Sequence, residues 1–132
     1  MANQLYGKYV EAALEGTFDT VTVNLKVALV TSGYTPSINV DQFVTDIGGG
    51  NIVARSGNLG SVTGSLGTLS AATETLTSVS GSAVSYIILY RDTGSDATSN
   101  LIAKWDTATG LPLTPNGGNI TITWNASGLF QL

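Results

Sequence analysis

The sequence predicts a mainly β fold, an antiparallel β-sandwich or jelly roll with an N-terminal helix and one short helix near residues 40–47. Residues 84–90 are apolar on both faces of a two-residue repeat and rich in β-branched and aromatic side chains, as in a strand covered on both sides. Residues 21–29 and 119–124 alternate apolar with polar side chains, as half-buried strands do. Connections rich in Gly, Ser, Thr and Pro separate the short apolar segments, which is typical of sandwiches and jelly rolls.

The composition suits a single domain over residues 1–132. Hydrophobic residues make up 42% of the 132 residues, enough for a core that buries about two-thirds of the surface of the unfolded chain. Charged residues make up only 11%, against roughly 25% in an average soluble domain. Either Thr, Ser, Asn and Gly form a neutral polar surface, or much of the surface is buried in an assembly. The sequence leaves both interpretations open.

Residues 3–15 are predicted to form the N-terminal helix. Leu5, Tyr6 and Tyr9 fall on one helical face, and Gly16 follows as a stop signal. The helix is expected to pack on the sheet. Alternatively, residues 1–16 act as a helical arm that contacts a neighbouring subunit.

The next two predicted elements are a strand and a short helix. The alternation of side chains predicts the strand over residues 20–31. Asn39 is a good N-cap and Gln42 holds the capping-box position three residues later, so the helix is expected over residues 40–47. Gly48 and the two glycines after it end this helix. No Gly-Lys-Ser/Thr sequence follows them, so a phosphate-binding loop is not supported.

The other predicted strands are short, at residues 52–54, 73–79, 101–105, 119–124 and 129–132. Those at 101–105 and 119–124 are expected to join residues 84–90 in the core of the sheet. Residues 57–72 space single apolar residues among Gly, Ser and Thr, which indicates weak strands or a long loop. Residues 111–118 contain two prolines and a pair of glycines, so they are predicted to form a loop.

The amino-acid composition excludes the commonest catalytic and metal-binding sites. The chain has no His and no Cys, so neither a Ser-His-Asp or Cys-His triad nor a His/Cys zinc site can form. We therefore expect no enzymatic activity, no catalytic residues, no cofactor and no metal. The five Lys and Arg residues are scattered and the net charge is −4, which argues against nucleic-acid binding. The chain shows no basic amphipathic stretch, secretory-signal pattern or run of about 18 apolar residues, so a membrane partner is not expected.

One motif has a weak catalytic interpretation. Asp92-Thr93-Gly94 matches the Asp-Thr-Gly triplet of aspartic proteases, in which two such carboxylates share a proton at a dimer axis. Asp92 and Asp96 could also hold a calcium ion, although the full EF-hand pattern is missing. An ordinary solvated turn between two strands is the favoured interpretation, because Asp, Thr, Gly and Ser are common turn residues.

Aromatic residues suggest a binding role. Trp105 and Trp124 could stack on sugars, although tryptophans near strand ends more often pack in the core or at its rim. Tyr34, beside Pro36, is expected to anchor its loop.

Several stretches of the chain resemble a family of small structural proteins of tailed bacteriophages. The principal one is Val27–Pro36, and Tyr90–Gly94, Leu101–Ile102, Ile120–Trp124 and Gly128–Phe130 support it. The resemblance implies a virion component, similar to head decoration or cement proteins. Such proteins sit on the outer capsid as oligomers, often trimers. The resemblance identifies no contact residues.

The sequence thus leads to two main functional hypotheses. The first is a non-enzymatic capsid decoration protein that stabilises the phage head on its outer surface, with the major capsid protein and its own copies as partners. The alternative is a tail-associated module that binds a host receptor or carbohydrate. In the first hypothesis the protein is a homo-oligomer, a trimer, because few charges, open sheet edges and an apolar first helix favour burial between subunits. Leu5, Tyr6 and Tyr9 are the expected contacts.

Overall fold

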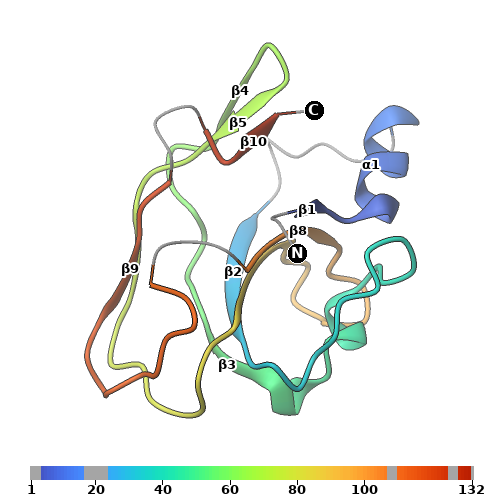
Figure 1. The fold of residues 1–132 in the computed structure, drawn as a ribbon. Coiled ribbons are helices and arrows are strands. Elements are labelled where there is room, and N and C mark those ends of the chain that lie inside the picture. The colour runs from blue at the N-terminus through green and yellow to red at the C-terminus, as the bar shows by residue number, and fades with distance from the viewer. Residues whose placement is uncertain (1–3, 17–23, 107–109, 125–127, 132) are drawn as a thin grey trace.

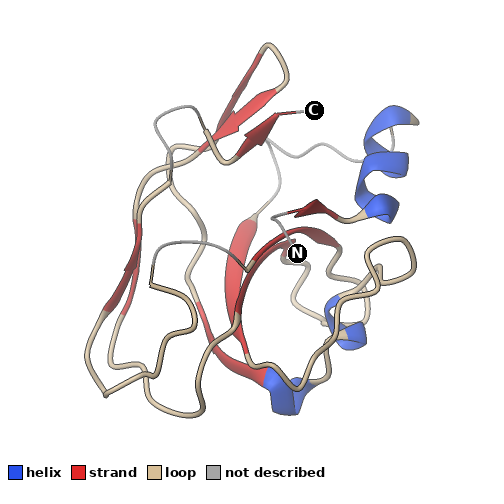
Figure 2. Cartoon of the chain, viewed as in Figure 1, coloured by secondary structure: helices blue, strands red, loops and turns tan. Residues whose placement is uncertain are grey.

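The computed structural model describes residues 4–16, 24–106, 110–124 and 128–131. The chain is mainly β, with antiparallel strands and an N-terminal helix, which confirms the predicted fold class (Figure 1, Figure 2). The largest sheet contains, in spatial order, β1 (Gln4–Leu5), β8 (Leu101–Trp105), β7 (Tyr86–Arg91), β2 (Leu25–Val30) and β3 (Ile52–Arg55). A sandwich or jelly roll in the strict sense stays a prediction.

Strand β7 is the middle strand of the five-stranded sheet, as its sequence predicts. It pairs with β2 on one side and β8 on the other. Ile88, Leu89 and Tyr90 are at most 1% exposed. Strand β8 begins and ends at the predicted residues. The predicted return from residues 84–90 through a turn to 101–105 is therefore confirmed.

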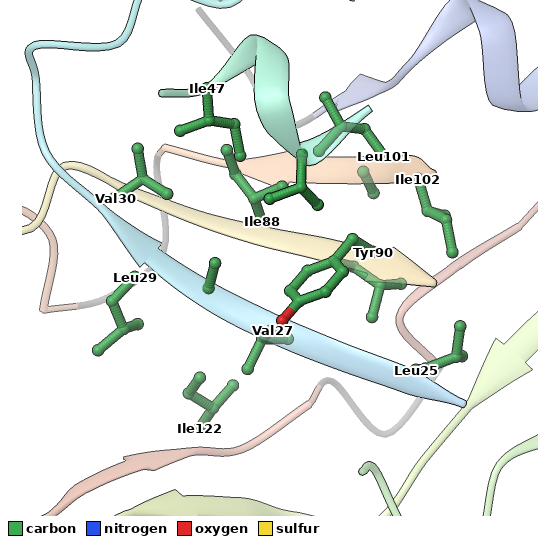
Figure 3. Packing of buried hydrophobic residues seen from close by; sticks show 14 of the residues in the cluster. Leu25, Val27, Leu29, Val30, Ile47, Ile88, Tyr90, Leu101, Ile102 and Ile122 are labelled. Carbon is green, nitrogen blue, oxygen red and sulfur yellow. The ribbon is translucent and has the colours of Figure 1, made fainter. Parts of the chain in front are cut away.

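Strand β2 is more buried than its alternating pattern predicts. The expected half-buried strand over 20–31 is covered on both faces from Val27 to Val30. Ile47 lies over one face of the sheet, near Val30 and Ile88, and Ile122 lies under the other, near Leu29 (Figure 3). The small side chain of Ala28 sits on the face that the sequence assigned to polar residues, so the pattern underestimates its burial. Residues 20–23 lie outside the described residues.

Strand β9 (Ile120–Ile122) corrects the prediction that residues 119–124 join the core sheet. It pairs instead with β6 (Glu74–Leu76) in a separate two-stranded sheet. This pair stands on one side of the five-stranded sheet, and the helical turns of residues 44–51 lie on the other (Figure 1). Alternation correctly identified a half-buried strand, since Ile122 is buried and Thr121 exposed, but it does not specify the partner.

A third sheet consists of β4 (Thr63–Ser65), β5 (Thr68–Ser70) and β10 (Phe130–Gln131). Strands β4 and β5 form a hairpin in the segment predicted as weak strands or a long loop. The predicted strand over residues 129–132 is observed as the shorter β10. Leu132 lies outside the described residues.

The N-terminal helix is shorter than predicted. Helix α1 spans Gly7–Leu14, and Gly16 has a φ of +73°, the left-handed conformation that often follows a helix. Gln4 and Leu5 belong to strand β1, which pairs with β8, and the Tyr6 N–H donates to the Ile102 carbonyl at 2.9 Å. Pairing with the sheet edge therefore overrides the helical pattern before Gly7. Residue 3 lies outside the described residues.

The second predicted helix is reduced to one 3₁₀ turn, η1 (Val44–Asp46). The expected N-cap at Asn39 is wrong. Residues 37–41 form a turn instead, in which the Asp41 carboxylate accepts from the Ser37 N–H at 2.9 Å. The Asp46 carboxylate accepts from the N–H groups of residues 42 and 43, and so satisfies the start of the turn. A second 3₁₀ turn, η2 (Gly49–Asn51), follows Gly48.

Candidate binding site

The structure brings Trp105 and Trp124 together from β8 and from the end of β9. Their ring centroids are 5.3 Å apart, and the rings are tilted by 50°. The Trp124 Nε1–H donates to the Ala72 carbonyl at 3.1 Å. Both rings are half-buried. Their mutual packing and this hydrogen bond hold Trp124 in one orientation, which is what an aromatic binding surface requires.

A hollow of about 490 Å³ lies beside Trp124. Its volume falls within the roughly 300–1,000 Å³ of small-molecule sites. The apolar part of its wall comes from β7, from the loop before β9 and from β9 itself: Ile87, Leu111, Leu113, Ile120, Ile122 and Trp124. Asn119, Thr121 and Thr123 supply polar groups, and no charged residue lines it. The hollow can therefore receive an uncharged, largely apolar group.

The three predicted contact residues have different places. Tyr6 is 0% and Tyr9 3% exposed, so both belong to the subunit's own core and are not available to a neighbour in this conformation. The Tyr9 ring packs edge-on against Phe130 with centroids 5.9 Å apart. Leu5 is half-buried and lines a smaller hollow of about 330 Å³. The oligomer itself stays a prediction, but two of its expected contacts are taken up within the subunit.

Other apolar side chains are exposed instead. Leu14 at the end of α1 is 84% exposed, Val40 in the turn before η1 is 74%, and Leu66 at the tip of the β4–β5 hairpin is 94%. The sequence identified none of them as contacts, because Val40 and Leu66 are single apolar residues without a periodic signal and Leu14 continues the apolar face of the predicted helix.

Tyr6 instead takes part in a buried hydrogen-bonded chain. The Tyr34 hydroxyl donates to the Asp41 carboxylate at 2.6 Å, and the Tyr6 and Tyr34 hydroxyl oxygens are 2.9 Å apart. Because Tyr34 has one hydroxyl proton and gives it to Asp41, Tyr6 is the donor to Tyr34. This chain ties the start of α1 to the loop over residues 34–41. The prediction that Tyr34 anchors its loop is confirmed.

Burial raises the pKa of both tyrosines above the ordinary value. For Tyr34 the hydrogen bond to Asp41 raises the pKa further, because ionisation would place two negative charges side by side. For Tyr6 burial is again the main cause of the raised pKa, and the Tyr34 hydrogen bond partly offsets it. Both hydroxyls therefore stay protonated at neutral pH and act structurally.

The Asp92-Thr93-Gly94 triplet lies in a turn that ion pairs connect to β2 and β3. The Asp92 carboxylate accepts from the Gly94 N–H at 3.1 Å and from Lys26 Nζ at 2.9 Å. The Asp96 carboxylate pairs with both terminal nitrogens of Arg55, at 2.6 and 2.7 Å.

These cations decide the protonation of the two carboxylates. The Lys26 ammonium lowers the pKa of Asp92, and the Arg55 guanidinium lowers the pKa of Asp96. A protease dyad needs a carboxyl whose pKa is raised so that it keeps a proton. Both carboxylates here are stabilised in the ionised form, which favours the interpretation as an ordinary turn.

Among the described residues, no group of three or more His, Cys, Asp or Glu side chains is close enough to hold a metal ion. Within the same ranges, none of the helices has the length and apolar character to cross a bilayer.

The sequence does not predict which residues form the ion pairs. Arg55 and Asp96 are 41 residues apart, and only the fold brings β3 beside the turn after β7. Lys104 and Asp106 form another pair at 2.8 Å, with side chains 5% and 15% exposed. A lysine in the middle of an apolar strand signals such burial, because an unpaired buried ammonium is costly.

Neither the models of known protein families nor the curated proteins match this chain.

Proposed function

We propose that this protein is a non-enzymatic structural component of a tailed-bacteriophage virion, a decoration protein on the outer surface of the head. The resemblance of Val27–Pro36 and the supporting stretches to phage structural proteins motivates the virion assignment. The observation that carries the structural role is the chemistry of the hollow beside Trp124, whose lining is largely apolar and contains no charged residue. Such a site binds by contact and burial rather than by proton or group transfer.

The proposal includes a homo-oligomer, a trimer, bound to the major capsid protein. Charged residues are 11% of the chain, and the large apolar side chain of Leu66 is 94% exposed. Apolar surface of this kind is stabilised when a neighbouring subunit covers it. Three-fold positions on a capsid suit a closed trimer.

Quantitative mass spectrometry of separated heads and tails tests the assignment. A decoration protein should be found in the head fraction in many copies, in a fixed ratio to the major capsid protein. Recovery from the tail fraction alone, or absence from both fractions, would refute it.

A tail-associated carbohydrate-binding module is the second candidate, and the pairing of Trp105 with Trp124 beside the hollow favours it. Glycan-array binding gives the test. This candidate expects binding that Trp124→Ala abolishes and that Trp124→Phe retains in part, since phenylalanine keeps an aromatic face but loses the N–H donated to Ala72. No binding by the folded wild-type protein would rule it out.

A further inference from the structure

The β4–β5 hairpin ends in a turn that suits its own residues poorly. Ser65 pairs with Thr68, so Leu66 and Gly67 alone form the turn. Both have positive φ, +52° and +82°, the combination of a type I′ turn, in which Asn-Gly is the favoured sequence. A left-handed leucine is disfavoured because its Cβ crowds the backbone. The turn itself therefore gives no reason for a leucine here.

Solvent exposure adds a second disadvantage for Leu66. The residue is 94% exposed, more than Leu14 or Val40, and the hairpin projects from the body of the subunit (Figure 1). Leucine at this position strains the backbone and exposes apolar surface to water. It therefore stabilises the isolated subunit less than an asparagine would. Such outliers concentrate at places where a protein makes contacts outside itself.

The same chain offers a hollow that fits this side chain. The hollow beside Trp124 measures about 490 Å³, and its lining is largely aliphatic, with Ile87, Leu113 and Ile120 among its residues. An aliphatic wall favours an aliphatic guest, because the contact removes apolar surface of both from water. The hydroxyl of Thr121 and the amide of Asn119 provide polar groups of the kind found at the rim of protein interfaces.

We propose that Leu66 of one subunit inserts into this hollow of a second copy of the chain. The inference rests on the homo-oligomer of the proposed function and names its contact. Ser65, Gly67 and Thr68 flank the leucine and carry no charge, and the hollow has none, so no charged group is buried by the contact. Hairpin and hollow lie on different elements, so each copy can both give and receive a leucine. In the trimer of the proposed function this contact is head-to-tail and repeats around a closed ring.

Leu66→Asn separates this contact from folding. Asparagine is favoured in the first position of a type I′ turn, so the variant should unfold in urea at the same or a higher concentration than the wild type. It removes the inserted side chain, so the dissociation constant of the oligomer should rise roughly ten- to hundredfold. Light scattering over a concentration series measures the second quantity.

Val40→Asn is the matched control, because it makes a similar change at another exposed apolar residue outside the hairpin. It should leave the dissociation constant unchanged. The proposal is overturned if the wild-type protein is a monomer at millimolar concentration, if Leu66→Asn assembles like the wild type, or if Val40→Asn weakens assembly equally.

Cysteine cross-linking identifies the two surfaces directly, since the chain has no cysteine of its own. Disulfides form when the two Cα atoms come within about 7 Å. A variant with Leu66→Cys and Leu113→Cys should yield covalent oligomers under mild oxidation, and one with Val40→Cys and Leu113→Cys should not. An oligomer seen by light scattering that fails to cross-link would overturn this contact while leaving the virion assignment standing. If the protein is found in phage heads but is a monomer in solution, the Leu66 contact is likewise overturned and the virion assignment stands.

Discussion

Replacing Tyr34 with phenylalanine removes the hydroxyl that joins Tyr6 to Asp41. The phenyl ring remains, with its edge-on contact to Tyr86 at 6.1 Å between centroids. The variant loses a hydrogen bond to a charged acceptor, and the Tyr6 hydroxyl, which is in a residue 0% exposed, loses its acceptor. Hydrogen bonds to charged groups contribute about 1.5–3 kcal/mol, and a buried donor without a partner costs about 1–3 kcal/mol. These contributions overlap, so we expect a loss of about 2–4 kcal/mol in the free energy of unfolding.

Tyr6→Phe should cost less, about 1 kcal/mol, because Tyr34 keeps its bond to Asp41. The double variant should cost less than the sum of the two single variants, because it no longer contains the stranded Tyr6 hydroxyl. Urea denaturation at pH 7 measures all three free energies. A Tyr6→Phe cost equal to or above that of Tyr34→Phe, or additive costs, would refute the donor order Tyr6 to Tyr34 to Asp41.

The other predictions concern ionisation, a buried pair and a glycine. Folding raises the pKa of Tyr6 and Tyr34, so their contribution to stability is complete below the unfolded pKa of about 10 and is lost as pH rises above it. The urea midpoint of the Tyr6→Phe, Tyr34→Phe double variant should therefore fall less above pH 10 than that of the wild type. The pKa of Asp96 is lowered, so its contribution is present above about pH 4 and lost below it; Asp96→Asn should cost under about 1 kcal/mol at pH 7, because the pair with Arg55 is partly exposed, and should flatten the fall in stability toward acid pH. Lys104→Met should cost about 3 kcal/mol by urea denaturation, because it takes the buried ammonium from a carboxylate that is only 15% exposed, and an unchanged midpoint would contradict the burial of the lysine. Gly128→Ala should cost about 2 kcal/mol or more, because φ there is +100° and a Cβ would lie 2.6 Å from a carbonyl oxygen of β5; a stability equal to that of the wild type would show that β10 does not dock as described.

Elements whose pattern is local were predictable. The run around Ile88 is apolar on both faces and proves to be the middle strand, and Leu101–Trp105 matches β8 at both ends. The two faces of these strands carry the burial pattern themselves, so no knowledge of the partner is needed.

Elements that depend on a distant partner were not predictable to the same degree. Gln4 and Leu5 continue the helical pattern of α1, but pairing with β8 makes them a strand. Strand β9 was recognised as half-buried, yet the pattern cannot say that its partner is β6 rather than β7. Residues 57–72 were ambiguous because the hairpin turn there is Leu66-Gly67, which lacks the Asn-Gly signature of its turn type.

The candidate site was predictable in its parts but not in its assembly. Trp105 and Trp124 were both singled out as possible binding residues, and the structure places their rings 5.3 Å apart. Leu113 and Ile120 give no sign in the sequence that they line the same hollow, since the loop between β8 and β9 and strand β9 itself must first be placed. Conversely, Tyr6 and Tyr9 have the apolar pattern of a contact face, but the same pattern describes a core face.

The measurement that tests the central proposal most directly is a cryo-electron microscopy reconstruction of the phage particle. We expect repeated density on the outer surface of the head into which the five-stranded sheet fits, arranged as closed rings at three-fold positions. Density for this protein confined to the tail, or no such density on a particle prepared with the protein present, would contradict it.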